Sequence, residues 1–126
     1  MKTLTKLQLS IATVVLSFSV LASPSVQLDE AKTDITDTAS LQNGAKLFMN
    51  YCSGCHAISF MRYNRIGTDL GLSDADIEEN LMFASDKVGE NITTAMPEKG
   101  ASDWFGGTPP DLSLVSRSKG TDWIYS

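Results

Sequence analysis

The sequence has few of the thiol and imidazole side chains that bind metals. Its 126 residues include two cysteines and one histidine, and 10 basic residues against 15 acidic ones give a formal charge of −5. Two cysteines are too few for a scaffold stapled by several disulfides, and the acidic balance argues against a nucleic-acid partner. The chain is long enough for one small domain. Any chemistry that needs a thiol or an imidazole must therefore use these three side chains.

The two cysteines and the histidine form one motif, Cys52-x-x-Cys55-His56. Two thiols three positions apart can each add to a vinyl group of one haem, and the next residue can present its imidazole to the iron. This pattern is the c-type haem attachment signature. The motif predicts one covalent haem c, held by Cys52 and Cys55, with His56 as the metal ligand.

Other interpretations of the cysteine pair stay open. A redox-active dithiol of the thioredoxin type needs a strand before the motif, whereas the residues before Cys52 have a helical pattern. A structural disulfide is a further alternative. A zinc site is disfavoured, because a closed site needs four ligands and the adjacent Cys55 and His56 cannot easily both reach an ion that Cys52 already binds.

The amino terminus has the pattern of a secretory signal peptide. Lys2 and Lys6 precede an apolar run over residues 9–21. The segment Val20-Leu21-Ala22 suits cleavage after Ala22, so residues 1–22 are predicted to be the signal peptide. The run has 13 residues, fewer than the roughly 20 that span a membrane. An uncleaved anchor is the alternative. Export agrees with haem attachment, which takes place outside the cytoplasmic membrane.

Cleavage makes the chain more acidic. Without Lys2 and Lys6, 8 basic and 15 acidic residues remain, a formal charge of −7. Such a surface suits a basic redox partner, because complementary fields speed the encounter. Ordinary solubility explains the same charge equally well.

The remaining sequence predicts an arm followed by one domain. Residues 23–39 are polar without helical periodicity and are predicted to be an N-terminal arm, and residues 40–126 form the domain. A first helix is predicted from Ser40, its cap, to about Tyr51. We expect another helix backbone to lie close to Gly44, because a glycine inside a helix costs about 1 kcal/mol relative to alanine. The apolar positions of this helix are Leu41, Gly44, Ala45, Phe48 and Cys52.

A second helix is predicted after Ser73, because Ser73 and Asp76 form a variant of the capping box. We expect it to end near Ser85. Its expected buried residues are Ile77, Leu81 and Ala84. One short turn of helix is predicted within residues 96–105, a short helix over residues 112–117, and another helix after Thr121 as its cap. Because no strand-like alternation persists, the fold class is all-α with long loops.

Longer stretches resemble a known family. Gly44-x-x-x-Phe48 before the motif is similar to the opening of class I cytochromes c. The segments Met61-Arg62-Tyr63-Asn64-Arg65, Asn80-Leu81-Met82-Phe83, Asp86-Lys87-Val88-Gly89, Trp104-Phe105-Gly106 and Pro109-Pro110-Asp111-Leu112 resemble bacterial cytochrome c1. That family is the haem subunit of quinol–cytochrome c reductase, the bc1 complex. The resemblance covers nearly all of residues 29–126 and implies a class I cytochrome c-like haem domain.

The resemblance implies roles for several residues. His56 is the proximal iron ligand, and a backbone carbonyl at Pro110 accepts the Nδ1–H of His56. Arg117 lies where the family places an arginine against a haem propionate, a charge-assisted bond that suits a guanidinium. Arg62 and Arg65 are weaker candidates for the same contact.

The resemblance also implies a function. One electron at a time passes from a Rieske iron–sulfur protein to a soluble cytochrome c, on the periplasmic side of the bacterial inner membrane. A partner cytochrome b subunit oxidises the quinol, so the chain is not an enzyme by itself and has no catalytic residue. The alternatives are a free periplasmic cytochrome c shuttle and a haem enzyme or sensor with an open iron position.

The chain is short for this family. Cytochrome c1 continues to a methionine ligand, a haem-covering helix and a transmembrane anchor, so we expect the C-terminal part of the domain to be missing. Met96 is a weak candidate for the sixth ligand, because the family's ligand follows the Pro-Pro-Asp-Leu segment. We also expect marginal stability, since the apolar face around Gly44 and Phe48 lacks its covering helix.

Overall fold

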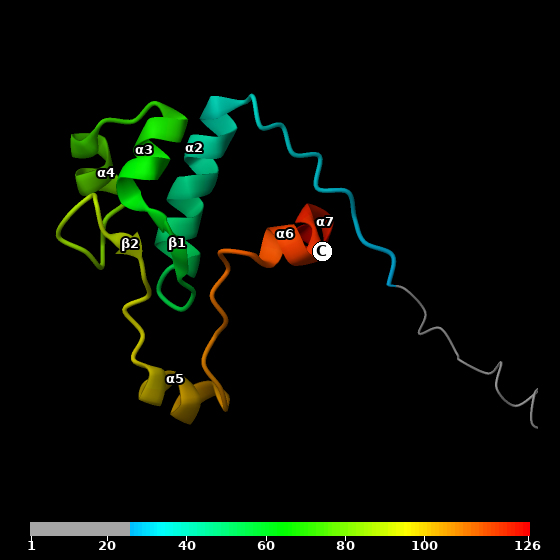
Figure 1. Cartoon of the computed structure of the whole chain (residues 1–126). Coiled ribbons are helices and arrows are strands. Elements are labelled where there is room, and N and C mark those ends of the chain that lie inside the picture. The colour runs from blue at the N-terminus through cyan, green and yellow to red at the C-terminus, as the bar shows by residue number, and fades with distance from the viewer. Residues whose placement is uncertain (1–25) are drawn as a thin grey trace, which may run out of the picture.

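The computed structural model describes residues 26–126, and the predicted signal peptide lies outside them. The chain is mostly helical, as predicted. Figure 1 shows α2, α3, α4 and two short strands gathered together, while α5 and the pair α6–α7 stand apart from them at the ends of long loops. In chain order the elements are α2 (Thr38–Leu47), the π-helical turn η1 (Phe48–Cys52), β1 (Ile58–Arg62), α3 (Tyr63–Leu70), α4 (Asp74–Asn80), β2 (Asn91–Ile92), α5 (Glu98–Phe105), α6 (Val115–Lys119) and α7 (Thr121–Tyr125).

The first helix begins earlier than expected and widens at its end. Asp37, rather than Ser40, is the cap, and its carboxylate accepts the N–H of Ser40 at 3.0 Å. Both are good capping types, and the chain uses the earlier one. From Phe48 the backbone forms a π-turn, in which the N–H of Ser53 donates to the carbonyl of Phe48 at 3.0 Å. Single π-turns inside helices are frequent at functional sites.

The second helix begins where it was predicted. The Ser73 hydroxyl accepts the N–H of Asp76 at 3.2 Å, and the Asp76 carboxylate accepts the N–H of Ser73 at 3.0 Å, which completes the capping box. The helix ends at Asn80, earlier than expected, because Leu81 leaves the helical conformation with φ −128°. Leu81 still reaches the core, whereas Ala84 falls on an exposed loop, so its predicted burial is wrong.

A small sheet and one helix were not foreseen. β1 and β2 pair antiparallel with an irregular register, in which Ile58 lies opposite Ile92. β2 has two residues, too few to show any periodicity. α3 follows β1 directly, and it ends at Gly71 in the left-handed conformation that glycine favours. The hydrophobic core consists of Met49, Tyr63, Ile77, Leu81 and Ile92.

The C-terminal helices lie near their predicted positions. α5 has eight residues rather than one turn. α7 begins at Thr121, but Gly120 occupies the cap position and no side-chain bond caps the helix, so the predicted capping role of Thr121 is wrong. Thr121 already has a place in the first turn and cannot cap it. The arm before α2 contacts α7, because the N–H of Asp29 donates to Ser126 Oγ at 2.8 Å and that of Ala31 to Asp122 Oδ1 at 3.0 Å.

Gly67 and Gly44 are a matched pair for alanine substitution. A Cβ at Gly67 would lie 3.0 Å from the Leu72 carbonyl oxygen and 3.4 Å from Ile77 Cγ1. Within residues 26–126 nothing lies within 4 Å of a Cβ at Gly44, so the close helix expected there is not found. We predict that Gly67→Ala lowers the free energy of unfolding by about 1–3 kcal/mol through overpacking, whereas Gly44→Ala raises it by about 0.5–1 kcal/mol.

Urea unfolding of the two variants beside the parent chain measures both effects. A Gly67→Ala variant that is as stable as the parent would contradict the tight contact at Gly67, and a Gly44→Ala variant that is less stable would contradict the open space at Gly44.

The capping box should make part of the stability depend on pH. Hydrogen bonds from the Ser73 hydroxyl and then the Ser73 N–H lower the pKa of Asp76. A carboxyl group whose pKa is lower in the folded state stabilises the fold above its unfolded pKa, about 3.9, and that contribution is lost as the pH falls through the folded value. We predict that Ser73→Ala lowers the urea midpoint at pH 7 and that its difference from the parent shrinks at pH 3.

Ser116→Ala on the exposed face of α6 is the control, because the Ser116 side chain caps no helix. If Ser73→Ala lowers the urea midpoint by the same amount at pH 7 and at pH 3, the ionised Asp76 carboxylate does not account for the stability that the capping box provides.

Candidate haem-attachment site

The motif forms a tight turn directly after the π-turn. The Cys52 carbonyl accepts the N–H of Cys55 at 3.0 Å and that of His56 at 2.8 Å. Both thiols are free and half-buried. The Thr94 hydroxyl donates to the Gly54 carbonyl at 2.8 Å, which ties the turn to the segment after β2. The turn therefore displays two thiols and an imidazole on a short, anchored stretch of backbone.

The His56 ring is held by the chain on one side. His56 Nδ1 lies 2.8 Å from the carbonyl oxygen of Pro110. A carbonyl can only accept, so Nδ1 carries the proton, and the lone pair of the neutral ring is on Nε2. A metal-binding histidine has this arrangement, in which a backbone carbonyl fixes the tautomer and the orientation of the ring. The structure thus brings together His56 and Pro110, which lie 54 positions apart.

The His56–Pro110 bond belongs to a larger contact, here called the clasp, between residues 56–60 and 110–113. The N–H of Leu112 donates to the carbonyl of Ala57 at 2.8 Å. The N–H of Phe60 donates to Ser113 Oγ at 3.1 Å. Two further bonds join the N–H and the hydroxyl of Ser59 to the carboxylate of Asp111. The clasp is therefore made of both backbone and side-chain hydrogen bonds.

The amino-acid sequence alone assigns no role to Asp111, Ser59 or Ser113. The N–H of Ser113 donates to Asp111 Oδ1 at 2.7 Å, a bond from residue i+2 to an aspartate that marks an Asx-turn. Asp-x-Ser is a local signal for that turn, but nothing in the sequence pairs it with Ser59, 52 positions away. Desolvation acts to raise the pKa of Asp111, but hydrogen bonds from Ser113 and Ser59 outweigh it and hold this pKa well below its ordinary value.

Two hollows flank the motif. One, of about 510 Å³, is lined by Cys55, His56 and residues 105–109. The other, of about 640 Å³, lies against Cys52. Its remaining lining residues come from the arm, α2, η1 and α7, and they are Ala31, Thr33, Gly44, Leu47, Phe48, Tyr51, Thr121, Ile124 and Tyr125. Because Cys52 and Cys55 border different hollows, a group bonded to both sulfurs borders both.

The donor set fits a haem c. Two free thiols three positions apart match its two vinyl groups, and the imidazole offers a neutral Nε2 to iron. The second hollow is lined by large side chains that are exposed to solvent, among them Tyr51 (80% exposed) and Tyr125 (66% exposed). Exposed apolar patches of this kind are typical of ligand-binding or partner-binding sites. Within residues 26–126 no group of three or more His, Cys, Asp or Glu residues is placed to hold a metal ion.

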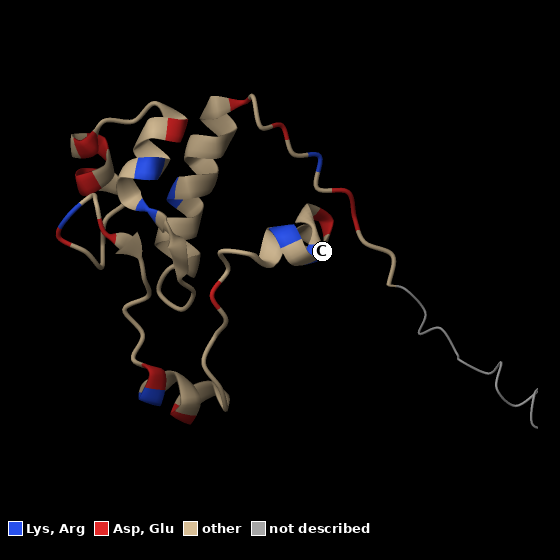
Figure 2. Cartoon of the chain, viewed as in Figure 1, with Lys and Arg blue, Asp and Glu red and all other residues tan. Residues whose placement is uncertain are grey.

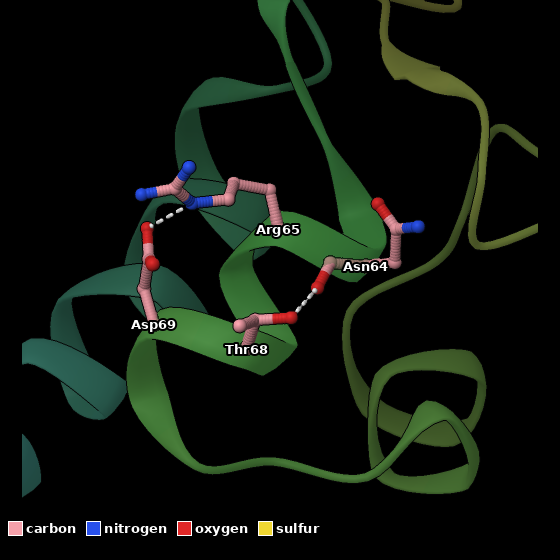
Figure 3. A network of polar contacts seen from close by, with 4 residues as sticks. All are labelled: Asn64, Arg65, Thr68 and Asp69. Carbon is pink, nitrogen blue, oxygen red and sulfur yellow. Dashed lines mark hydrogen bonds and ion pairs between the residues drawn. The ribbon is translucent and has the colours of Figure 1, made fainter.

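None of the arginines predicted to contact the haem lines either hollow beside the motif. Arg117 is exposed on α6, and no hydrogen bond or ion pair within the described chain joins it to the motif. Arg62 donates to the Gly89 carbonyl. Arg65 pairs with Asp69 one turn along α3 at 2.7 Å (Figure 3), and that hydrogen bond raises the pKa of Arg65. The two weaker candidates are therefore engaged elsewhere.

Met96 lies just before α5, and its N–H donates to the Thr94 hydroxyl at 3.2 Å. It lines neither of the two hollows beside the motif.

Comparison with known proteins decides the family. Residues 29–126 match the Cytochrome C1 family. The chain belongs to the cytochrome c1 family. It is 50% identical over 99 residues to cytochrome c1 of Allochromatium vinosum, an alignment that covers 79% of this chain and 41% of that protein.

Two further relatives are informative. The ammonia monooxygenase gamma subunit of Nitrosomonas europaea is 46% identical over 101 residues, which are 80% of this chain and 43% of that protein. Cytochrome b/c1 of Bradyrhizobium diazoefficiens is 27% identical over 103 residues, with coverage of 66% and 15%. This cytochrome c1 family chain therefore spans less than half the length of these relatives.

Family membership identifies the cofactor as a covalent haem c, and the Cys52-x-x-Cys55-His56 segment is consistent with a haem-attachment motif. The cytochrome c-like haem domain expected from the sequence is thus confirmed. Across residues 26–126 the chain has no helix that combines the length and the apolar character needed to cross a membrane.

Proposed function

We propose that the chain transfers one electron at a time through its haem c as the haem-bearing part of a cytochrome c1. Cys52 and Cys55 hold the group by thioethers, and His56 Nε2 binds the iron. The observation that carries the proposal is the hydrogen bond from His56 Nδ1 to Pro110, because it leaves Nε2 as the free ring nitrogen. Bound in this way, a haem supplies reversible one-electron chemistry.

The chain's own residues hold and tune the site. The Pro110 carbonyl fixes the orientation of the His56 ring. By accepting a hydrogen bond from Nδ1–H, it also makes Nε2 a stronger electron donor to a metal. The apolar side chains that line the second hollow offer the group a surface to pack against beside Cys52. Arg117 is proposed to pair with a propionate, since its exposed guanidinium on α6 follows the clasp and suits a carboxylate.

The finer parts of the function are proposed from the relatives and the surface. The names cytochrome c1 and cytochrome b/c1 support assembly with cytochrome b, with a Rieske iron–sulfur protein as donor and a soluble cytochrome c as acceptor. Figure 2 shows acidic residues spread over α4, the arm and α7, and an acidic surface favours a basic redox partner. We place the domain, residues 40–126, behind the arm of residues 23–39, on the periplasmic side of the inner membrane.

The first test is covalent attachment. The parent chain, made together with a haem-maturation system, should keep its pigment through extraction with acidified acetone. Cys52→Ser and Cys55→Ser should each keep one thioether and shift the pyridine haemochrome band to longer wavelength, because one vinyl group stays unreacted. The double variant should lose all covalent pigment.

Gly54→Ala is the matched control, since it lies between the thiols and a Cβ there meets nothing within 4 Å. It should retain the parent spectrum. Pigment that washes out of the parent chain would end the proposal.

The second test concerns the partners. In membranes extracted with mild detergent, the full-length protein should co-purify with a cytochrome b and an iron–sulfur subunit. Recovery of all the protein in the soluble periplasmic fraction would favour a free shuttle and refute the complex.

A further inference from the structure

We propose that Asp111 is a positioning residue for the haem ligand. Its carboxylate joins Ser59 to Ser113 and thereby holds the Pro110 carbonyl against His56 Nδ1. The inference rests on the proposed function, because it assigns a role toward the iron through His56.

The carboxylate spans both sides of the clasp next to the histidine. Asp111 follows Pro110 directly, and Ser59 lies three positions after His56. Asp111 Oδ2 accepts the N–H of Ser59 at 3.0 Å and also the Ser59 hydroxyl, while Oδ1 accepts the N–H of Ser113 at 2.7 Å. One side chain therefore fixes both segments whose separation decides the His56–Pro110 distance of 2.8 Å.

The backbone alone cannot make this end of the clasp. Pro109 and Pro110 have no N–H, so they donate nothing to residues 56–58. The nearest backbone bond is that from Leu112 to Ala57, and it lies beyond the prolines. A carboxylate at position 111 supplies acceptors for Ser59 where a regular strand would use a backbone carbonyl.

The strength of the tie comes from its charge. Hydrogen bonds to an ionised carboxylate are roughly twice as strong as neutral ones. The hydrogen bonds from Ser113 and Ser59 outweigh desolvation and hold the pKa of Asp111 below its ordinary value, which favours the ionised form. Asparagine at this position keeps one acceptor oxygen and the Asx-turn, whereas alanine keeps neither.

The experiment uses the unique histidine. His56 is the only one in the chain, so ¹⁵N-histidine labels a single residue. In the haem-loaded full chain, reduced and saturated with carbon monoxide to keep the iron diamagnetic, solvent exchange of the Nδ1 proton is measured by NMR. Asp111→Ala should exchange it at least about tenfold faster, because the bond to Pro110 opens more often. Asp111→Asn should lie between alanine and the parent.

The reduction potential gives an independent readout. A weaker bond from Nδ1 makes the imidazole a poorer donor to ferric iron, so Asp111→Ala should move the midpoint potential upward. Asp111→Asn removes the same charge but keeps an acceptor, so its shift should be smaller. Equal shifts in the two variants would show that charge alone acts, and would overturn the positioning role.

Asp34→Ala is the matched control. Asp34 Oδ1 accepts the N–H of Thr36 at 2.8 Å and its hydroxyl at 2.7 Å, the same kind of turn placed in the arm. This variant removes an equal charge and should leave proton exchange at His56 unchanged. If Asp111→Ala does not fold, Ser59→Ala replaces it; it deletes only the hydroxyl bond and should speed exchange by a smaller factor.

The outcomes separate the two proposals. Parent-like exchange and potential in haem-loaded Asp111→Ala would overturn the positioning role and leave electron transfer intact. A parent chain that takes up no haem would overturn the proposed function itself.

Discussion

The hydrogen bond between His56 Nδ1 and the Pro110 carbonyl is the contact on which the site depends. It makes a surface histidine into a fixed base with one free nitrogen, which is the form that iron needs. Because the two residues lie 54 positions apart, the bond also sets how the segment after α5 returns to β1. The other bonds of the clasp hold the same two segments together, so the contact of residues 110–113 with residues 56–60 orients the ring.

Local signals were sufficient for some parts of the fold. The capping box of Ser73 and Asp76 was predicted because both partners lie within one helical turn, and the thiol–imidazole motif because its three members are nearly adjacent. The start of α2 was missed because Asp37 and Ser40 are equally good caps only one turn apart.

Long-range polar pairing could not be predicted in this way. Nothing in the residues themselves joins Asp111 to Ser59, and β2 pairs with β1 through two residues that carry no pattern. The Pro110 contact came from family resemblance rather than from any local rule, and Arg117 remains a proposal because α6 leaves it exposed. Buried helical faces can be predicted from the periodicity of apolar residues, whereas polar contacts between distant loops leave no periodic pattern in the sequence.

The π-turn over Phe48–Cys52 has a consequence for how this chain can vary. A π-turn accommodates one residue more than the regular helix around it. A chain that lost one residue here could close the ladder of hydrogen bonds again and keep α2, yet every later side chain would rotate about the helix axis. Both sulfurs would then face new directions, although none of their chemistry had changed. The number of residues between Phe48 and Cys52 therefore determines where the two thiols point.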